Sequence, residues 1–218
     1  MAYRRTERVI ARLAARHEAI VAAARALAGE TGMSAVQIVP VAERAGIASG
    51  TVYRYFPSKE DLVAALVAAT AEQEIAAIRG AVTAAPGPLS ALAAAIMAFA
   101  GRALRERRLA AAMLAGPSDG EAAAERLAFR RALADELAAR IGAAIEARHL
   151  PDQDASFAAA AVIGAVVEGL VGELSATAET AEARHSAAQA LTLFALKGLG
   201  VADARARGLV VQAGEARS

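Results

Sequence analysis

Residues 45–61, AGIASGTVYRYFPSKED, carry a mixture of side chains suited to contacting a nucleic acid. Tyr53, Tyr55 and Phe56 surround Arg54, and Lys59 follows two positions after a proline. Hydroxyl and guanidinium groups hydrogen-bond to phosphates and to the edges of bases. A short helix at this point, anchored by one apolar side chain, would present these groups to DNA.

The preceding residues supply a turn between two short helices. The pattern over 41–45 predicts the end of one helix, and Gly46 follows, where a left-handed backbone conformation costs little. Ile47 returns the chain to the core, and Ser49 and Gly50 lead into the next helix. Two short helices joined by a glycine turn form a helix-turn-helix, which places its second helix in the major groove.

The spacing of these residues resembles the N-terminal signature of the TetR family, the tetracycline-repressor-like regulators. The resemblance covers about residues 16–65. The matching positions are Val41-Ala42, Ala45-Gly46, Gly50-Thr51-Val52-Tyr53-Arg54-Tyr55-Phe56 and Lys59-Glu60-Asp61-Leu62. Two residues depart from the family: Ala48 stands where a Ser or Thr usually caps the recognition helix, and Pro40 lies in the second helix. We expect a weak cap and a second helix that starts late, because proline is tolerated only near a helix start.

The resemblance implies a transcriptional regulator, in its simplest form a ligand-responsive repressor that binds a palindromic operator in double-stranded DNA as a homodimer. Tyr53 has an alternative role in core packing, since one face of the recognition helix must be buried. The residues expected at the DNA are Gln37, Ser49, Gly50, Thr51, Tyr53, Arg54, Tyr55 and Lys59.

Composition and charge indicate a basic head on a helical body. The chain of 218 residues is 56% hydrophobic and alanine-rich, has only 4% aromatic residues, and shows no strand-like alternation, which predicts an all-α fold. Net charge is +5 over residues 1–59 and −4 over residues 60–218, as expected when DNA binding is confined to the N-terminus. Cysteine is absent, and the arginine-rich N-terminus does not resemble a signal peptide, so we expect a cytoplasmic protein.

The breaks in the sequence predict about nine helices. We expect a three-helix DNA-binding domain over 1–60, a helical ligand-binding and dimerisation domain over 61–200, and a flexible tail over 201–218. Residues 58–61 have the form of a capping box, and 118–119 are expected to cap a later helix. Residues 1–14 carry four arginines and could either continue the first helix or act as an arm toward the minor groove. After the head, helices are expected over about 58–80, 88–107, 109–115, 118–149, 153–175 and 180–199.

By resemblance, the body should enclose an effector pocket, and the ligand should shift the dimer between DNA-competent and DNA-incompetent states. The chain has no tryptophan and few buried polar candidates, which favours a small apolar effector over a sugar or nucleotide. Arg102, Arg130 and Arg131 leave an acidic ligand open, and each apolar candidate has ordinary core packing as its alternative role. The candidate lining residues are Met97, Phe99, Met113, Leu114, Phe129 and Phe157.

The segment 155–174 is almost entirely apolar. Glu168 and Glu173 argue against a membrane span, because a charged group inside a bilayer is costly. A helix packed on both the core and a second subunit explains the segment better, and the resemblance implies that the last two long helices form a four-helix dimer interface. The residues expected at this interface are Ala161, Gly164, Ala165, Glu168 and Gly172.

Nothing in the sequence indicates catalysis. Phosphate-binding loops, paired histidines with metal-ligand spacing and nucleophile elbows are absent, so we expect no enzyme activity, no cofactor and no metal. The main alternative is a helical adaptor whose TetR-like head makes protein–protein contacts, which the weak cap and Pro40 leave open.

Overall fold

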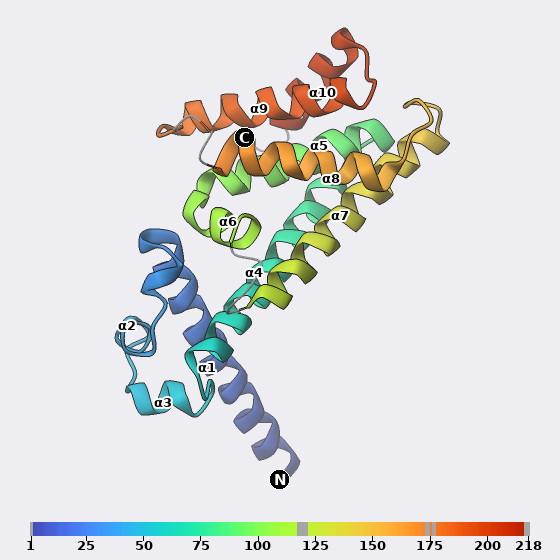
Figure 1. The fold of residues 1–218 in the computed structure, drawn as a ribbon. Helices are drawn as coiled ribbons and strands as arrows, with labels where there is room; N and C mark the ends of the chain where they lie inside the picture. The colour runs from blue at the N-terminus through green and yellow to red at the C-terminus, as the bar shows by residue number, and fades with distance from the viewer. Residues whose placement is uncertain (1, 117–121, 173–174, 176–177, 216–218) are drawn as a thin grey trace.

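The computed structural model describes residues 2–116, 122–172, 175 and 178–215, and in these ranges the chain is helical without strands (Figure 1). The expected all-α fold, with a helix-turn-helix head and a helical bundle, is confirmed. In these described ranges, two short turns, the 3-10 turn η1 and the π-helical turn η2, accompany ten α-helices. The elements are α1 (Ala2–Thr31), η1 (Met33–Ala35), α2 (Ile38–Arg44), α3 (Ser49–Tyr53), α4 (Lys59–Val82), α5 (Pro88–Arg105), α6 (Arg107–Leu114), α7 (Ala123–Glu146), α8 (Ala155–Val166), η2 (Val167–Val171), α9 (Ala181–Gly198) and α10 (Asp203–Glu215).

The head is built from α1, α2 and α3. Ile20 and Ala24 form a buried stripe on α1, helix α2 packs against α1, and α3 packs against α2. Gly46 has a φ of 65°, the left-handed conformation that the turn between α2 and α3 requires. Pro40 lies in the first turn of α2, and Ala48 caps α3 without a side-chain hydrogen bond, so both sequence-based expectations for this region are met.

The N-terminal part of α1 extends beyond the packed head. Residues 7–19 are exposed, and the blue end of the helix projects past α3 in Figure 1. The exposed residues include Val9, Ile10 and Leu13, which continue the apolar stripe of the same helix. Residues 2–14 therefore continue the first helix and do not form a separate extended arm.

Helix α4 joins the head to the body. The expected capping box is present: the Asp61 amide donates to Ser58 Oγ, and the Ser58 amide donates to Asp61 Oδ2, both over 3.1 Å. The first half of α4 contacts α1, and the helix continues along α5 and α7. Its buried side chains belong to one continuous core that extends from the head into the body.

Helix α5 is the centre of the body. It contacts α4, α7, α9 and α10, and its side chains Leu92 and Ile96 are completely buried. Alanines occupy much of the remaining buried surface of α5, and their small size lets the surrounding helices approach closely. Leu133, Leu137 and Ile141 of α7 are completely buried and form an apolar stripe at four-residue spacing.

Two details differ from the sequence-based expectations. The sequence predicts a flexible tail over 201–218, but residues 203–215 form α10, which buries Ala206 and Val210 against α5 and α9. The helix expected over 153–175 ends as α8 at Val166 and widens into the π-helical turn η2. The cap expected at 118–119 lies outside the described residues.

Within the described ranges, no helix combines the length and the apolar character needed to cross a membrane.

Candidate DNA-binding surface and ligand cavity

Helix α3 presents one buried and one exposed face. Val52 is completely buried, and Phe56, one turn further along the chain, is 3% exposed with its ring centroid 4.8 Å from that of His17. The opposite face carries Gly50, Tyr53 and Arg54, which are exposed. Tyr53 is 53% exposed, so it is not the core residue that the sequence left as an alternative.

The other DNA-contact candidates surround this face at different depths. Gln37 is exposed at the start of α2, and its side-chain amide donates to the Ser34 carbonyl over 3.2 Å. Ser49, Thr51, Tyr55 and Lys59 are half-buried, and Tyr55 packs on the core. The backbone turn of the helix-turn-helix therefore gathers all eight candidates into one region of the head, four exposed and four half-buried.

Two arginines of the head, Arg44 and Arg54, differ in whether they form a salt bridge with a carboxylate of the protein. Arg44 forms a bidentate pair with Glu30 across 2.7 to 2.8 Å, which ties α2 to the end of α1. Among the described residues, Arg54 forms no such pair, and its guanidinium is exposed at the end of α3. A guanidinium without an acid partner is available for a phosphate or a guanine base.

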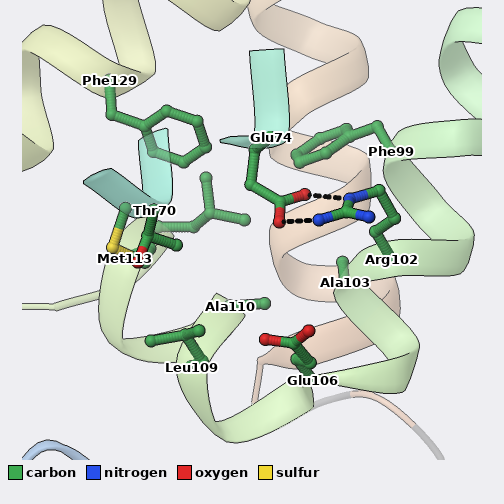
Figure 2. A pocket seen from close by; sticks show the side chains of 11 residues that line it. Thr70, Glu74, Phe99, Arg102, Ala103, Glu106, Leu109, Ala110, Met113 and Phe129 are labelled. Carbon is green, nitrogen blue, oxygen red and sulfur yellow. Dashed lines mark hydrogen bonds and ion pairs between the residues drawn. The ribbon is translucent and has the colours of Figure 1, made fainter. Parts of the chain in front are cut away.

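The body contains a small cavity enclosed by α4, α5, α6 and α7 (Figure 2). Its volume is about 20 Å³, close to the space that one water molecule occupies. Four of the predicted lining residues, Phe99, Met113, Leu114 and Phe129, form its apolar walls. The remaining lining residues are Thr70, Glu74, Arg102, Ala103, Glu106, Leu109 and Ala110.

The polar side of the cavity contains a sheltered ion pair. Arg102 donates to Glu74 through Nε over 2.7 Å and through Nη2 over 2.6 Å, and both side chains are less than a quarter exposed. The hydrogen bond to Glu74 raises the pKa of Arg102 above its ordinary value. Thr70 lies one turn before Glu74 on α4 and is 2% exposed, and its hydroxyl has no hydrogen-bond partner among the described residues.

Two predicted lining residues lie elsewhere. Phe157 is 73% exposed on α8. Met97 is buried between α5 and α9, where the Thr192 hydroxyl lies 3.9 Å from its sulfur, because the turn of α5 that carries Phe99 toward the cavity directs Met97 to the opposite side. Sequence reasoning also missed Thr70 and Glu74; the signal was their position as polar residues at four-residue spacing in the apolar stripe of Leu66 and Ile78.

A groove between α1 and α4 adjoins the cavity. It has a volume of about 600 Å³, and Thr70 and Glu106 line both the groove and the cavity. Arg25 of α1 lies in this groove, where it donates to Glu106 over 2.8 Å and lies 3.6 Å from Glu74. The head and the cavity are therefore joined by a continuous set of charged side chains.

The interface candidates lie on an exposed face of α8 and the residues that follow it. Ala161, Gly164 and Glu168 are exposed, whereas Ala165 and Gly172 are half-buried. Phe157 stands one turn before Ala161, and Phe194 of the neighbouring helix α9 is also strongly exposed, at 67%. Two large aromatic side chains next to small residues form an apolar face that a single chain leaves uncovered.

The head is similar to known proteins of one family. Residues 20–66 match the family model described as bacterial regulatory proteins, tetR family. The repressor KstR of Rhodococcus jostii RHA1 is 51% identical over 53 residues, and KstR of Mycobacterium tuberculosis H37Rv is 50% identical over 48. These matches cover 24% and 22% of this chain and 25% and 22% of the relatives, so the chain matches about a quarter of the length of these curated relatives.

Solved structures resemble the whole fold at low sequence identity. The structure of RolR in complex with resorcinol superposes with a TM-score of 0.65 at 21% identity, covering 96% of both chains. The regulator FadR of Bacillus subtilis, in complex with stearoyl-CoA, superposes with a TM-score of 0.64 at 20% identity, covering 80% of this chain and 97% of FadR. These likenesses show that the body as well as the head has the fold of these two proteins.

Proposed function

Because residues 20–66 match the family model of bacterial regulatory proteins, tetR family, we propose that this protein is a ligand-responsive repressor that binds a palindromic operator as a homodimer. The observation that carries the proposal is the exposed face of α3, where Gly50, Tyr53 and Arg54 project while Val52 anchors the helix. In this proposal residues 1–60 bind DNA in the cytoplasm, and residues from 61 onward bind the effector and form the dimer.

Each head supplies one recognition helix. Arg54 and Lys59 add positive charge at the two ends of the loop that follows α3, and Gly50 allows the DNA backbone to approach closely. A helix of five residues reaches only a few base pairs, so one head alone reads a short half-site. Two heads in a twofold dimer would read two half-sites about one DNA turn apart, which requires a palindromic operator.

The dimer in this proposal forms through α8 and α9. Their exposed face combines Phe157 and Phe194 with the small residues Ala161 and Gly164, so aromatic side chains of one protomer can pack where the backbone of the other comes close. Twofold symmetry brings the same patch together from both chains. Four helices, two from each protomer, would then cover the apolar face.

The cavity is the proposed effector site, and α6 connects it to the head. Leu109, Ala110 and Met113 of α6 form part of the cavity wall. The same helix contacts α1, where the Arg108 guanidinium donates to the backbone carbonyl of Glu30. A ligand larger than the present cavity must displace this wall, and the displacement would move the contacts that hold α1. A ligand that binds the displaced state more tightly shifts the population away from the DNA-binding arrangement.

Selection of bound fragments from a random duplex pool, at two salt concentrations, tests the proposal without knowledge of the effector. We expect enrichment of one palindrome and weaker binding at the higher salt concentration, since phosphate contacts release counterions. Salt-sensitive binding without an enriched sequence would contradict a specific operator. Complete absence of binding would favour the adaptor alternative.

A further inference from the structure

We infer that a pocket between α5, α9 and α10 is a second ligand site, which takes a small carboxylate with a short hydrocarbon chain. This pocket has a volume of about 210 Å³. No described residue lines both this pocket and the cavity between α4, α5, α6 and α7. A ligand could bind here whether or not the protein is a repressor.

The size of the pocket admits a small molecule without a rearrangement of the helices. Its volume of about 210 Å³ compares with about 20 Å³ for the cavity, which has room for about one water molecule. It is also smaller than the groove of about 600 Å³ between α1 and α4. A ligand of a few carbon atoms with one polar group therefore suits the pocket, whereas a long chain would extend into solvent.

The ionisable side chains of the lining are all basic. Arg105 comes from the end of α5, and Arg184 and His185 come from the start of α9. Among the described residues that line the pocket there is no aspartate or glutamate. A guanidinium donates paired hydrogen bonds in the geometry of a carboxylate, and a histidine ring adds a further N–H donor. The lining therefore favours an anion.

The described residues do not neutralise these basic side chains. Arg105 and His185 are exposed, and neither forms an ion pair or a side-chain hydrogen bond within the described ranges. Arg184 donates through Nη1 to the backbone carbonyl of Glu179 over 2.6 Å, which leaves its other donors for a ligand. The carboxylates of Glu179 and Glu182 are close in sequence, but neither residue lines the pocket. Two guanidinium charges at one pocket repel each other, and a bound anion relieves this repulsion.

The rest of the lining is apolar. Met97 and Ala188 are each 2% exposed, and Gly101 and Gly214 line the pocket with backbone alone. A methionine side chain is flexible and adapts to the shape of a short hydrocarbon chain. The ligand therefore places its carboxylate beside the basic side chains and its hydrocarbon part toward Met97. This apolar contact distinguishes it from phosphate and other inorganic anions.

The pocket lies at the start of α9, on the side of that helix away from its exposed aromatic residue. Ala181, the first residue of α9, lines the pocket, so the positive end of the helix dipole adds to the attraction for an anion. His185 and Phe194 are nine residues apart, which places them on opposite sides of the helix. A dimer formed through Phe194 therefore leaves the pocket open.

The methionine methyl signals in an NMR spectrum of the full-length protein, without DNA, test this assignment with butanoate as the probe. Of the four methionines, Met97 lines the pocket and Met113 lines the cavity. We expect butanoate to shift the Met97 signal in a saturable manner and to leave the Met113 signal unchanged. Butanamide, which has no charge, acetate, which has a single methyl group, and inorganic phosphate should each bind at least about fivefold more weakly.

A Met97 signal that does not move, or a Met113 signal that moves in its place, would overturn the assignment. Affinity for butanamide, acetate or phosphate equal to that for butanoate would overturn the proposed ligand class. Since DNA is absent, each of these results is independent of whether the protein is a repressor.

Neutral variants of the two arginines identify the groups that bind the carboxylate. Arg105→Gln and Arg184→Gln should each weaken butanoate binding about tenfold, the effect of losing a hydrogen bond between charged groups, and neither adds a methionine signal. Arg130→Gln is the control, because Arg130 is also an exposed arginine but lies on α7, outside the pocket. Unchanged Met33 and Met113 signals show that each variant is folded. Wild-type butanoate affinity in both pocket variants would also overturn the proposal.

Discussion

Arg25 of the head donates a hydrogen bond of 2.8 Å to Glu106, the residue that separates α5 from α6. The same guanidinium lies 3.6 Å from Glu74, whose carboxylate is bound by Arg102. Glu74 and Glu106 both line the cavity, whereas Arg25 belongs to the helix on which the DNA-binding head is built. A movement of Glu74 or Glu106 at the edge of the cavity would therefore act directly on α1 through Arg25.

Replacement of Arg25 by methionine should uncouple the effector from DNA release. The partly exposed ion pair contributes less than about 1 kcal/mol to folding, so the free energy of unfolding should change little. Operator release on adding effector should become severalfold weaker, as measured by fluorescence anisotropy of labelled DNA. The control is Arg207→Met, which removes another exposed pair, with Asp203 on α10. An unchanged response in Arg25→Met would show that coupling takes another route.

Substitutions on the recognition surface should weaken operator binding without unfolding the head. Tyr53→Ala and Lys59→Ala should each cost about 1 to 3 kcal/mol of binding free energy, and the lysine change should also reduce the salt slope by about 1. Tyr53 is 53% exposed, so its loss leaves the core intact. Val39→Ala is the matched control, because Val39 is equally exposed in the head but apolar. Wild-type affinity in both test variants would mean that the recognition surface lies elsewhere.

A charged residue introduced on the exposed apolar face of α8 should convert the proposed dimer into monomers. We expect wild-type protein to have twice the chain mass of 22.1 kDa by light scattering and Phe157→Glu to have the monomer mass, since the interface would bury an unpaired carboxylate. Val211→Glu places the same charge on an exposed apolar position of α10 and should remain dimeric. A dimer that survives Phe157→Glu would exclude this face.

Glu136 should make stability depend on pH in the acidic range. Burial raises the pKa of this carboxyl, but hydrogen bonds from Arg79 and Arg140 lower it more, so its pKa lies below the ordinary value of 4.5. Its contribution is therefore complete above about the ordinary carboxylate pKa and is lost as pH falls through the lower folded-state pKa.

The variant Glu136→Gln isolates this effect. It should lower the free energy of unfolding at pH 7 by about 1 to 3 kcal/mol, the usual contribution of hydrogen bonds to a charged group. The difference from wild type should shrink as the pH is lowered below 4.5, which urea denaturation at several pH values will show. A difference that stays constant with pH would contradict the assigned role of the charge.

Local signals predicted the helix-turn-helix and the starts of several helices. Gly46 requires a turn, Ser58 and Asp61 form a cap through adjacent backbone groups, and Pro88 begins a helix as its missing amide allows. All of these depend on neighbours within a few residues, which a single sequence displays directly.

The residues of the cavity and of the proposed interface are hard to predict from the sequence, because their positions depend on how distant helices pack together. Phe99 and Phe157 are both large apolar residues on apolar helices, yet one lines the cavity and the other is exposed on α8. The Glu74–Arg102 pair joins residues on different helices, so no spacing rule predicts it. Helix α10 was missed because its alanine, arginine and glycine residues resemble a flexible tail, while the surface that Val210 covers belongs to α5 and α9.

Because α1 is one unbroken helix, a small tilt at Arg25 produces a larger displacement at its N-terminal end. The ion pairs of Arg25 hold it near one end, and Arg8 lies 17 residues toward the other, a distance of about 26 Å at 1.5 Å per residue. A tilt of about 10° at Arg25 would displace Arg8 by about 4 Å, more than the length of a hydrogen bond. A small tilt of α1 would thus become, at the tip of the helix, a movement large enough to make or break a contact.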